Sequence, residues 1–298
     1  MFRKRNLISR TSVEILPSAI QDFTFETLRL DAHGQIMAKM PGQARRVVQS
    51  LGQGVELSLV EVPGGMFRMG SIHEGGYDDE RPVHPVYIRP GLWLGQYAVT
   101  QAQWLAVMGH LPVCRFKGPQ APVESISWEE AAGFCRTLSK KTGRLYRLPS
   151  EAEWECACRA GTNSPFAYGE TLTTAVANYV GEHLYRQEAP GVYRHGPSPV
   201  GSFPPNVWGF YEMHGNIWEY CADVWQADYQ GLTTDSTSRQ VGRPAGDKTL
   251  RWRVARGGSW HEPPSHCRSA VRLQVSENDP LEFYGLRVLL QPAQNSVD

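Results

Sequence analysis

The chain has 298 residues, of which 41% are hydrophobic and 20% charged, and its 30 basic residues balance its 30 acidic ones. This composition is typical of a globular, core-forming protein with one large domain or two small ones. A net charge of zero gives no electrostatic reason to expect nucleic acid or a membrane as a partner. No apolar run reaches the length of a signal-peptide core or a membrane span, so we expect a cytoplasmic protein.

The chain changes character near residue 56. Residues 1–56 carry mixed charge and few aromatic side chains, whereas the sequence from Leu57 onward is rich in Gly, Trp and Pro. We therefore expect an N-terminal extension over residues 1–56, a main domain over residues 57–292 and a tail over residues 293–298. Within and beside the extension, alternating polarity predicts strands at residues 23–31 and 53–62, which would form an added hairpin or a remnant of a preceding module.

Capping boxes, in which Ser is followed by Glu three residues on, predict the starts of two helices. They are Ser127 with Glu130 and Ser150 with Glu153. Gly143 and Gly161 are placed to end these helices. A third helix is expected over residues 100–108, and short strands are expected at residues 86–89, 144–148, 251–257 and 284–290.

Residues 162–250 offer turn signals but little periodicity. The nine tryptophans of the chain and its other aromatic side chains are suited to anchor such loops, because each buries a large area. The sequence therefore predicts an α+β domain that is loop-rich, with little regular secondary structure.

Six cysteines are present. Cys135, Cys156 and Cys158 lie among core-type residues in the expected helices, where a thiol behaves as a small hydrophobic group. We expect buried free thiols, in keeping with a reducing compartment.

Several longer motifs occur in a fixed order and carry a resemblance. They are VPGGMFRMGS (62–71), YAVTQAQW (97–104), PVESISWEEAAGFCRTLS (122–139), YRLPSEAEWECACRAGT (146–162), FYEMHGNIWEYCADVW (210–225), RVARGGSW (253–260) and GLRV (285–288). From about residue 57 to residue 290 the chain resembles the formylglycine-generating-enzyme family, also called the sulfatase-modifying-factor domain. The resemblance implies an elaborated C-type-lectin-like fold.

The resemblance also implies where chemistry would occur. The family's enzymes oxidise a substrate cysteine to formylglycine with oxygen and copper(I), which two thiolates bind just after a Gly-Gly-Ser. Gly257, Gly258 and Ser259 match that motif, but Glu262 stands at the first cysteine position and Cys267 at the second. The interval between Cys267 and the following arginines, Arg268 and Arg272, is shorter than in the family's enzymes. An alignment that closes this gap places Cys267 opposite a non-catalytic position of the family. We therefore expect no copper site; Ser259 and Cys267 are the remaining candidates for catalysis.

The same family places a calcium ion around the segment EMHGNIWE. Glu212 and Glu219 would supply carboxylates, and Gly215 and Ile217 would supply backbone carbonyls. Hard oxygen ligands of this kind suit calcium. The alternative is that Glu219 pairs locally inside the protein.

Residues 260–284 mix bulky, polar and charged types, and they resemble the C-terminal region of diversity-generating-retroelement variable proteins. This likeness implies a surface that displays side chains to a protein or other ligand. The alternative is an ordinary surface loop. The display positions would be Trp260, His261, Glu262, Ser265, His266, Val271, Leu273, Val275, Glu277, Leu281, Glu282, Phe283 and Tyr284.

Two functions follow from the sequence. The first is a non-catalytic protein that binds a ligand through residues 260–284. The second is a copper-dependent formylglycine-generating oxidase, or a related oxidoreductase, with a non-standard centre near Ser259 and Cys267.

Overall fold

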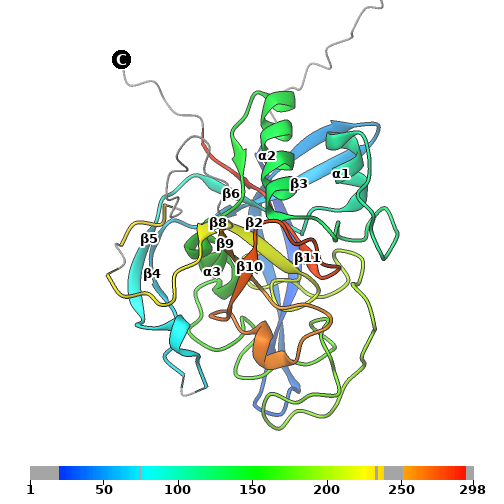
Figure 1. Ribbon diagram of the computed structural model, residues 1–298. Helices are drawn as coiled ribbons and strands as arrows, with labels where there is room; N and C mark the ends of the chain where they lie inside the picture. Colours follow the sequence, from blue (N-terminus) through cyan, green and yellow to red (C-terminus); the bar gives the residue numbers. More distant parts are fainter. Residues whose placement is uncertain (1–19, 74, 232–233, 238–250, 293–298) are drawn as a thin grey trace, which may run out of the picture.

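A computed structural model describes residues 20–73, 75–231, 234–237 and 251–292. The expected tail and the first 19 residues of the expected extension lie outside these ranges. No helix in the described ranges is long and apolar enough to cross a membrane. The described residues form strands, three helices and long irregular loops, so the predicted α+β class is confirmed (Figure 1).

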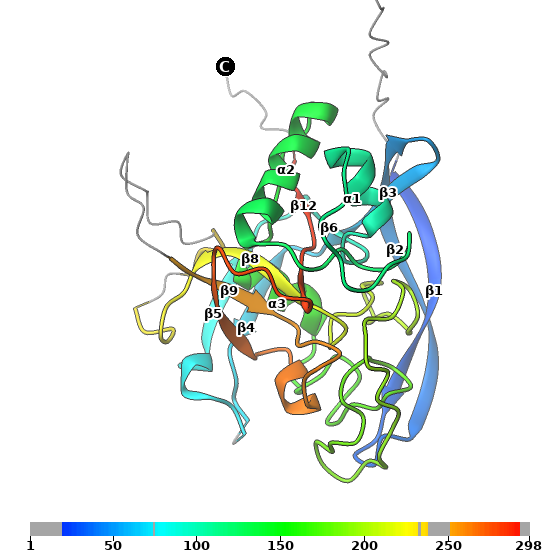
Figure 2. The ribbon, with the colours of Figure 1, turned by 45° about the vertical axis from the view of Figure 1, so that its right-hand side comes forward.

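The larger sheet has six strands in the order β1-β2-β3-β6-β12-β7. Its strands are β1 Ile20–Leu30, β2 Ile36–Gly52, β3 Val55–Val62, β6 Leu92–Gly95, β12 Leu289–Leu290 and β7 Tyr146–Arg147. Neighbouring strands in this sheet are antiparallel. The long β1–β2 hairpin lies along the right-hand side in Figure 2, beside the loops that follow α3. The extension is therefore continuous with the sheet of the main domain.

A second sheet of four strands has the order β10-β9-β8-β11, and a third consists of β4 and β5. Their bounds are β10 Arg272–Ser276, β9 Trp252–Arg256, β8 Trp218–Val224, β11 Tyr284–Gly285, β4 Gly65–Met69 and β5 His84–Ile88. Two 3-10 turns, η1 Asp78–Glu80 and η2 Pro264–Cys267, lie in loops. The segment that the sequence singled out for function, residues 260–284, follows β9, contains β10 and ends at β11.

Two of the helices begin where the capping boxes predict, and the third begins one residue after the start of the helix expected over residues 100–108. They are α1 Gln101–Met108, α2 Trp128–Thr142 and α3 Glu151–Arg159, with Thr100, Ser127 and Ser150 as N-caps. Gly143 ends α2 in the left-handed conformation, as expected. Helix α3 ends one residue earlier than predicted, because its C-cap is Ala160, which already adopts a left-handed φ of 46°.

The expected boundary at residue 56 lies inside β3, and β2 has no counterpart among the expected strands. Pro41 and Gly42 explain why the sequence did not predict β2, since both residues are rare inside strands. The structure accommodates them because β3 pairs only with residues 46–52 of β2, leaving Pro41 paired with β1 alone. A Cβ at position 42 would lie 2.2 Å from the Phe25 ring, so only glycine allows that ring to cross the strand.

The irregular loops after α3 are held by side chains, as their aromatic content suggested. The Asn206 amide donates to the carbonyls of Ala157 and Cys158 at the end of α3, at 2.7 and 3.2 Å. The Tyr168 hydroxyl donates to the carbonyl of Pro204. All six cysteines are free and buried, which confirms that expectation.

Candidate functional site

The segment from 260 to 284 runs through η2 and β10 and ends at β11. Eight of the thirteen expected display residues are at least partly exposed. They are His261, Glu262, Ser265, His266, Leu273, Leu281, Glu282 and Phe283.

The other five expected display residues are buried, and the prediction is corrected for them. Val271, Val275 and Tyr284 belong to the main hydrophobic core. Glu277 is 3% exposed and forms an ion pair with Arg253 at 3.4 Å. Trp260 is 4% exposed. Packing hides all five side chains from solvent, and the pattern of polar and apolar residues in the sequence does not reveal that packing.

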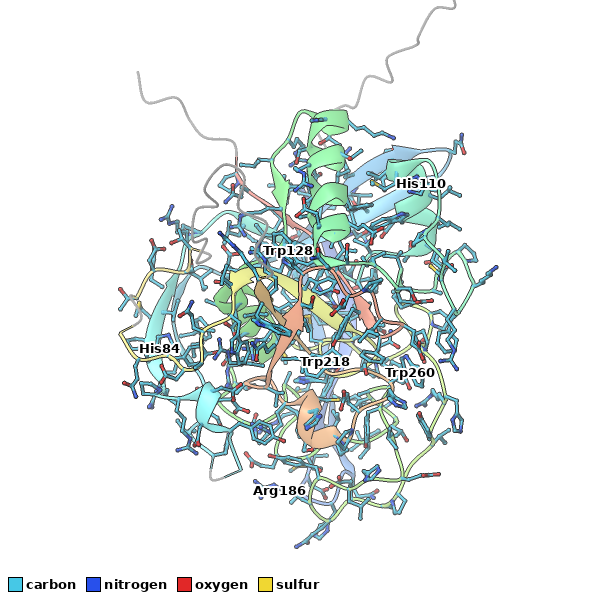
Figure 3. The ribbon with its side chains drawn as sticks, viewed as in Figure 1. His84, His110, Trp128, Arg186, Trp218 and Trp260 are labelled. Carbon is cyan, nitrogen blue, oxygen red and sulfur yellow. The ribbon has the colours of Figure 1, made fainter. Side chains whose placement is uncertain are left out.

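The exposed residues join aromatic side chains from distant segments in a cluster that we call the aromatic patch, consisting of Phe116, Tyr193, Trp260, His261 and Phe283. The Tyr193 hydroxyl lies 2.9 Å from His261 Nδ1. The rings of His261 and Phe283 are stacked, with centroids 6.2 Å apart. Phe116 meets Trp260 edge-on at 5.4 Å, and Figure 3 shows Trp260 near Trp218 on the face that holds η2. The sequence alone did not identify Phe116 and Tyr193, because only folding brings their loops beside Trp260 and His261.

Polar contacts border the aromatic patch. Glu262 Oε2 lies 2.6 Å from His266 Nδ1, and the Trp218 indole N–H donates to Glu262 Oε1 at 3.4 Å. Arg115 forms an ion pair with Glu282. The glutamate at the first cysteine position of the family motif thus holds a histidine and an indole in place.

The two catalytic candidates are both buried. Ser259 and Cys267 are 0% exposed. A Cβ on Gly258 would lie 2.5 Å from the Cys267 sulfur, so the glycine permits close packing over that thiol. Burial, reinforced by the nearby Glu262 carboxylate, raises the pKa of Cys267 well above its ordinary value. The structure therefore places a protonated, covered thiol where the oxidase reading needs an accessible thiolate.

The residues expected to bind calcium are engaged elsewhere. Both Glu219 oxygens contact the Arg287 guanidinium, at 2.8 to 3.2 Å, and Oε2 also accepts from the Trp154 indole at 2.7 Å. Glu212 accepts from the backbone N–H of Gly201 and of Phe203. In the described ranges, no three side chains of His, Cys, Asp or Glu are arranged to hold a metal ion. Binding calcium at the predicted set would require Glu219 to leave Arg287, and calcium stays a prediction.

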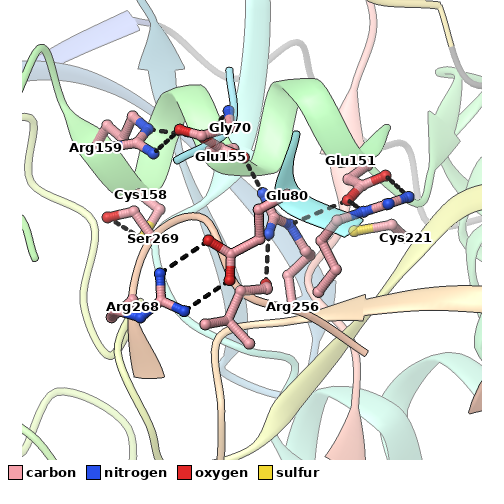
Figure 4. Close-up of polar contacts among 12 residues, drawn as sticks. Gly70, Glu80, Glu151, Glu155, Cys158, Arg159, Cys221, Arg256, Arg268 and Ser269 are labelled. Carbon is pink, nitrogen blue, oxygen red and sulfur yellow. Dashed lines mark hydrogen bonds and ion pairs between the residues drawn. The ribbon is translucent and has the colours of Figure 1, made fainter. Parts of the chain in front are cut away.

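Below the surface, buried ion pairs connect the segment to the rest of the fold (Figure 4). Arg268 binds both oxygens of Glu80, at 2.6 and 2.9 Å. Arg272 binds Glu151 at 2.6 Å. The two arginines after Cys267 therefore face inward and fix the path of the chain between η2 and β10.

The sulfatase-modifying factor enzyme 1-like domain model matches residues 46–292. The chain belongs to this family. Its fold is the family's C-type-lectin-like fold, as the resemblance implied, and the match begins ten residues before the expected boundary at residue 56.

Relatives and solved structures agree with this assignment. The chain is 28% identical to a formylglycine-generating enzyme of Thermomonospora curvata, over 83% of this chain and 97% of the relative. It is similar to the structure of PvdO from Pseudomonas aeruginosa, with 30% identity, a TM-score of 0.68, and coverage of 86% of this chain and 100% of that one. It also shares its fold with Treponema denticola variable protein 1, at 23% identity and a TM-score of 0.69, with coverage of 83% and 99%.

Proposed function

We propose that the chain is a non-catalytic ligand-binding protein built on this scaffold, with the partly exposed members of the aromatic patch and the exposed residues around them as its binding surface. The observation that carries the proposal is the pairing of a covered, protonated Cys267 with exposed aromatic side chains at the same place. The chain keeps the family's scaffold but covers the thiol, so the exposed side chains around it are suited to recognising a ligand and not to oxidising one. Calcium binding and a cytoplasmic location stay predictions beside it.

The chemistry of the surface favours a protein ligand. Aromatic rings contribute large contact area at low entropic cost when their neighbours already hold them, as Tyr193 and Phe283 hold His261. Trp260 is almost fully buried and supports Phe116, whose ring meets it edge-on.

A diversified surface is the finer form of this proposal. In a diversity-generating-retroelement variable protein, ligand-facing codons change while the core stays fixed. Sequencing the locus in independent isolates tests this. We expect variation at exposed positions such as His261, Leu281 and Phe283 but not at Val271 or Val275, and equal variation in both groups would contradict it.

Truncating the aromatic patch tests the binding surface. Phe283→Ala is expected to weaken binding to a partner recovered by crosslinking and then purified, by about tenfold or more, because a central aromatic anchor contributes upwards of about 1.4 kcal/mol. Leu145→Ala, exposed on another part of the chain, is the matched control and should leave the dissociation constant unchanged. Equal affinities of the Phe283 variant and the original chain would remove the patch from the interface.

The second candidate is the copper-dependent oxidase, and the coverage of 97% of the Thermomonospora curvata enzyme favours it. Copper(I) titration of the reduced chain, with that enzyme as the positive control, separates the two functions. We expect no tight stoichiometric copper binding and no oxidation of a cysteine-containing peptide. Stoichiometric binding that disappears in Cys267→Ala, together with turnover, would establish the oxidase instead.

A further inference from the structure

A second place on the molecule, the outer edge of β4, offers unpaired backbone groups beside a groove. Strands β4 and β5 lie at the left of Figure 1, apart from η2 and β11. In the described ranges β4 pairs only with β5, whereas the other edge of β5 is covered by residues 234–235 through a bridge between Tyr87 and Asp235. One edge of this two-stranded sheet is therefore closed and the other is open.

The register shows which backbone groups the open edge presents. Tyr87 donates its N–H away from β4, to the carbonyl of Thr234 at 2.8 Å, and Pro85 has no N–H to give. These two residues stand opposite Met66 and Arg68, so both are non-hydrogen-bonded pairs of the antiparallel ladder. The N–H and C=O groups of Met66 and Arg68 consequently point outward from β4, and nothing in the described ranges binds them.

A groove of about 320 Å³ follows this edge. Six consecutive residues, 63–68, line it; the last four belong to β4, where successive side chains point to opposite faces. Because residues of both faces line it, the cavity runs along the edge of the strand and not over one face. The opposite wall is formed by the end of α3 and the turn after it, with Trp208 beside them. The ring of Phe67 adds apolar surface on the β4 side.

The charge of the groove is one-sided. Two arginines and no Asp or Glu line it. Glu155 neutralises Arg159 at 2.8 Å, whereas Arg68 is exposed and has no acidic partner among the described residues. An extended ligand in the groove would therefore meet one uncompensated positive charge next to the outward backbone groups of β4.

We propose that the β4 edge binds an extended, acidic segment of a partner protein by strand addition. The segment's backbone pairs with Met66 and Arg68, its side chains enter the groove beside Phe67 and Trp208, and an Asp or Glu meets the Arg68 guanidinium. Main-chain pairing supplies affinity for any extended segment, and the groove and the charge supply selectivity. This site is independent of the aromatic patch.

The test uses a displayed library of random octapeptides selected on the full chain. We expect the selected peptides to be enriched in Asp and Glu and to slow hydrogen exchange at the amides of Met66 and Arg68. Arg68→Glu should weaken their binding by about tenfold, since an attractive charge becomes a repulsive one. Lys39→Glu, the same charge change at an exposed position of β2, should have no effect. N-methylation of alternate peptide amides should abolish binding in one register and spare it in the other.

Four results would overturn the proposal, three of them at the edge itself and one at the aromatic patch. The first is a selection that yields no binders or binders without acidic enrichment. The second is unchanged affinity in Arg68→Glu, which is an exposed substitution that leaves the fold intact. The third is protection of the Met66 and Arg68 amides that grows with protein concentration alone, which would assign the edge to a second copy of the chain. A loss of binding in Phe283→Ala instead would assign the peptides to the aromatic patch.

Discussion

Replacing Arg256 with methionine is expected to destabilise the protein by about 3–5 kcal/mol, because it leaves buried charges without their partner. Arg256 is 0% exposed, pairs with Glu155, lies 3.6 Å from Glu151, and donates to the carbonyl of Val271. Burial by itself would raise the pKa of Glu155, but the guanidiniums of Arg159 and Arg256 outweigh it and hold that pKa below its ordinary value. The carboxylate is therefore charged in the core and depends on both arginines.

Urea denaturation measures the loss. Arg89→Met is the matched control, because Arg89 forms an exposed ion pair with Asp235 at 3.4 Å, and such pairs contribute less than about 1 kcal/mol. A loss in Arg256→Met no larger than that in Arg89→Met would mean that the network contributes little.

Local signals allowed the helices and the family to be predicted. The capping boxes at Ser127 and Ser150 are short-range patterns in which a side chain bonds a backbone group three residues away, and the structure contains both. The order of the motifs likewise predicted the α+β, C-type-lectin-like fold. The β2 strand was not found, because Pro41 and Gly42 are accommodated only by its exposed end and by the Phe25 ring across from it.

The site was predicted in part, for a related reason. Residues 260–284 stay a predicted binding segment, of which the structure exposes eight of the thirteen expected display residues, because polarity alone does not tell which side chains face solvent. Val275 and Tyr284 lie in the core, and Glu277 is buried with an arginine from β9. Phe116 and Tyr193 join the aromatic patch from loops that are distant in sequence. The Tyr193 hydroxyl, for example, contacts His261, which lies 68 positions further along the chain. Contacts of this range are set by tertiary packing.

The stability of the chain between pH 7 and pH 4.5 is expected to be nearly flat because two buried groups titrate in opposite senses. His214 is 2% exposed; its Nε2 accepts from the Ala167 N–H at 3.0 Å, so Nδ1 carries the hydrogen donated to the Cys267 carbonyl at 2.8 Å. Burial lowers the pKa of His214 to about 4. The unfolded chain binds a proton there near pH 6.5 and the folded chain does not, so acidification from pH 6.5 to 4 removes about 3 kcal/mol.

Glu212 acts in the opposite direction. It is 5% exposed, and burial raises its pKa to about 7, although backbone N–H groups of Gly201 and Phe203 oppose that rise. The folded chain therefore holds a proton on Glu212 that the unfolded chain has released between pH 7 and its ordinary pKa of 4.5. This stabilisation is complete below pH 4.5 and disappears as the pH rises through 7, again by about 3 kcal/mol.

Separating the two groups tests both assignments. Glu212→Gln removes the compensating titration, so its free energy of unfolding should fall by about 3 kcal/mol between pH 7 and 4.5, measured by urea denaturation at each pH. His214→Phe should show the reverse, a rise on acidification over the same range. The double variant should return to a flat profile whatever its absolute stability, because neither titrating group remains. A Glu212→Gln profile parallel to that of the original chain would show that Glu212 is ionised in the folded protein at neutral pH.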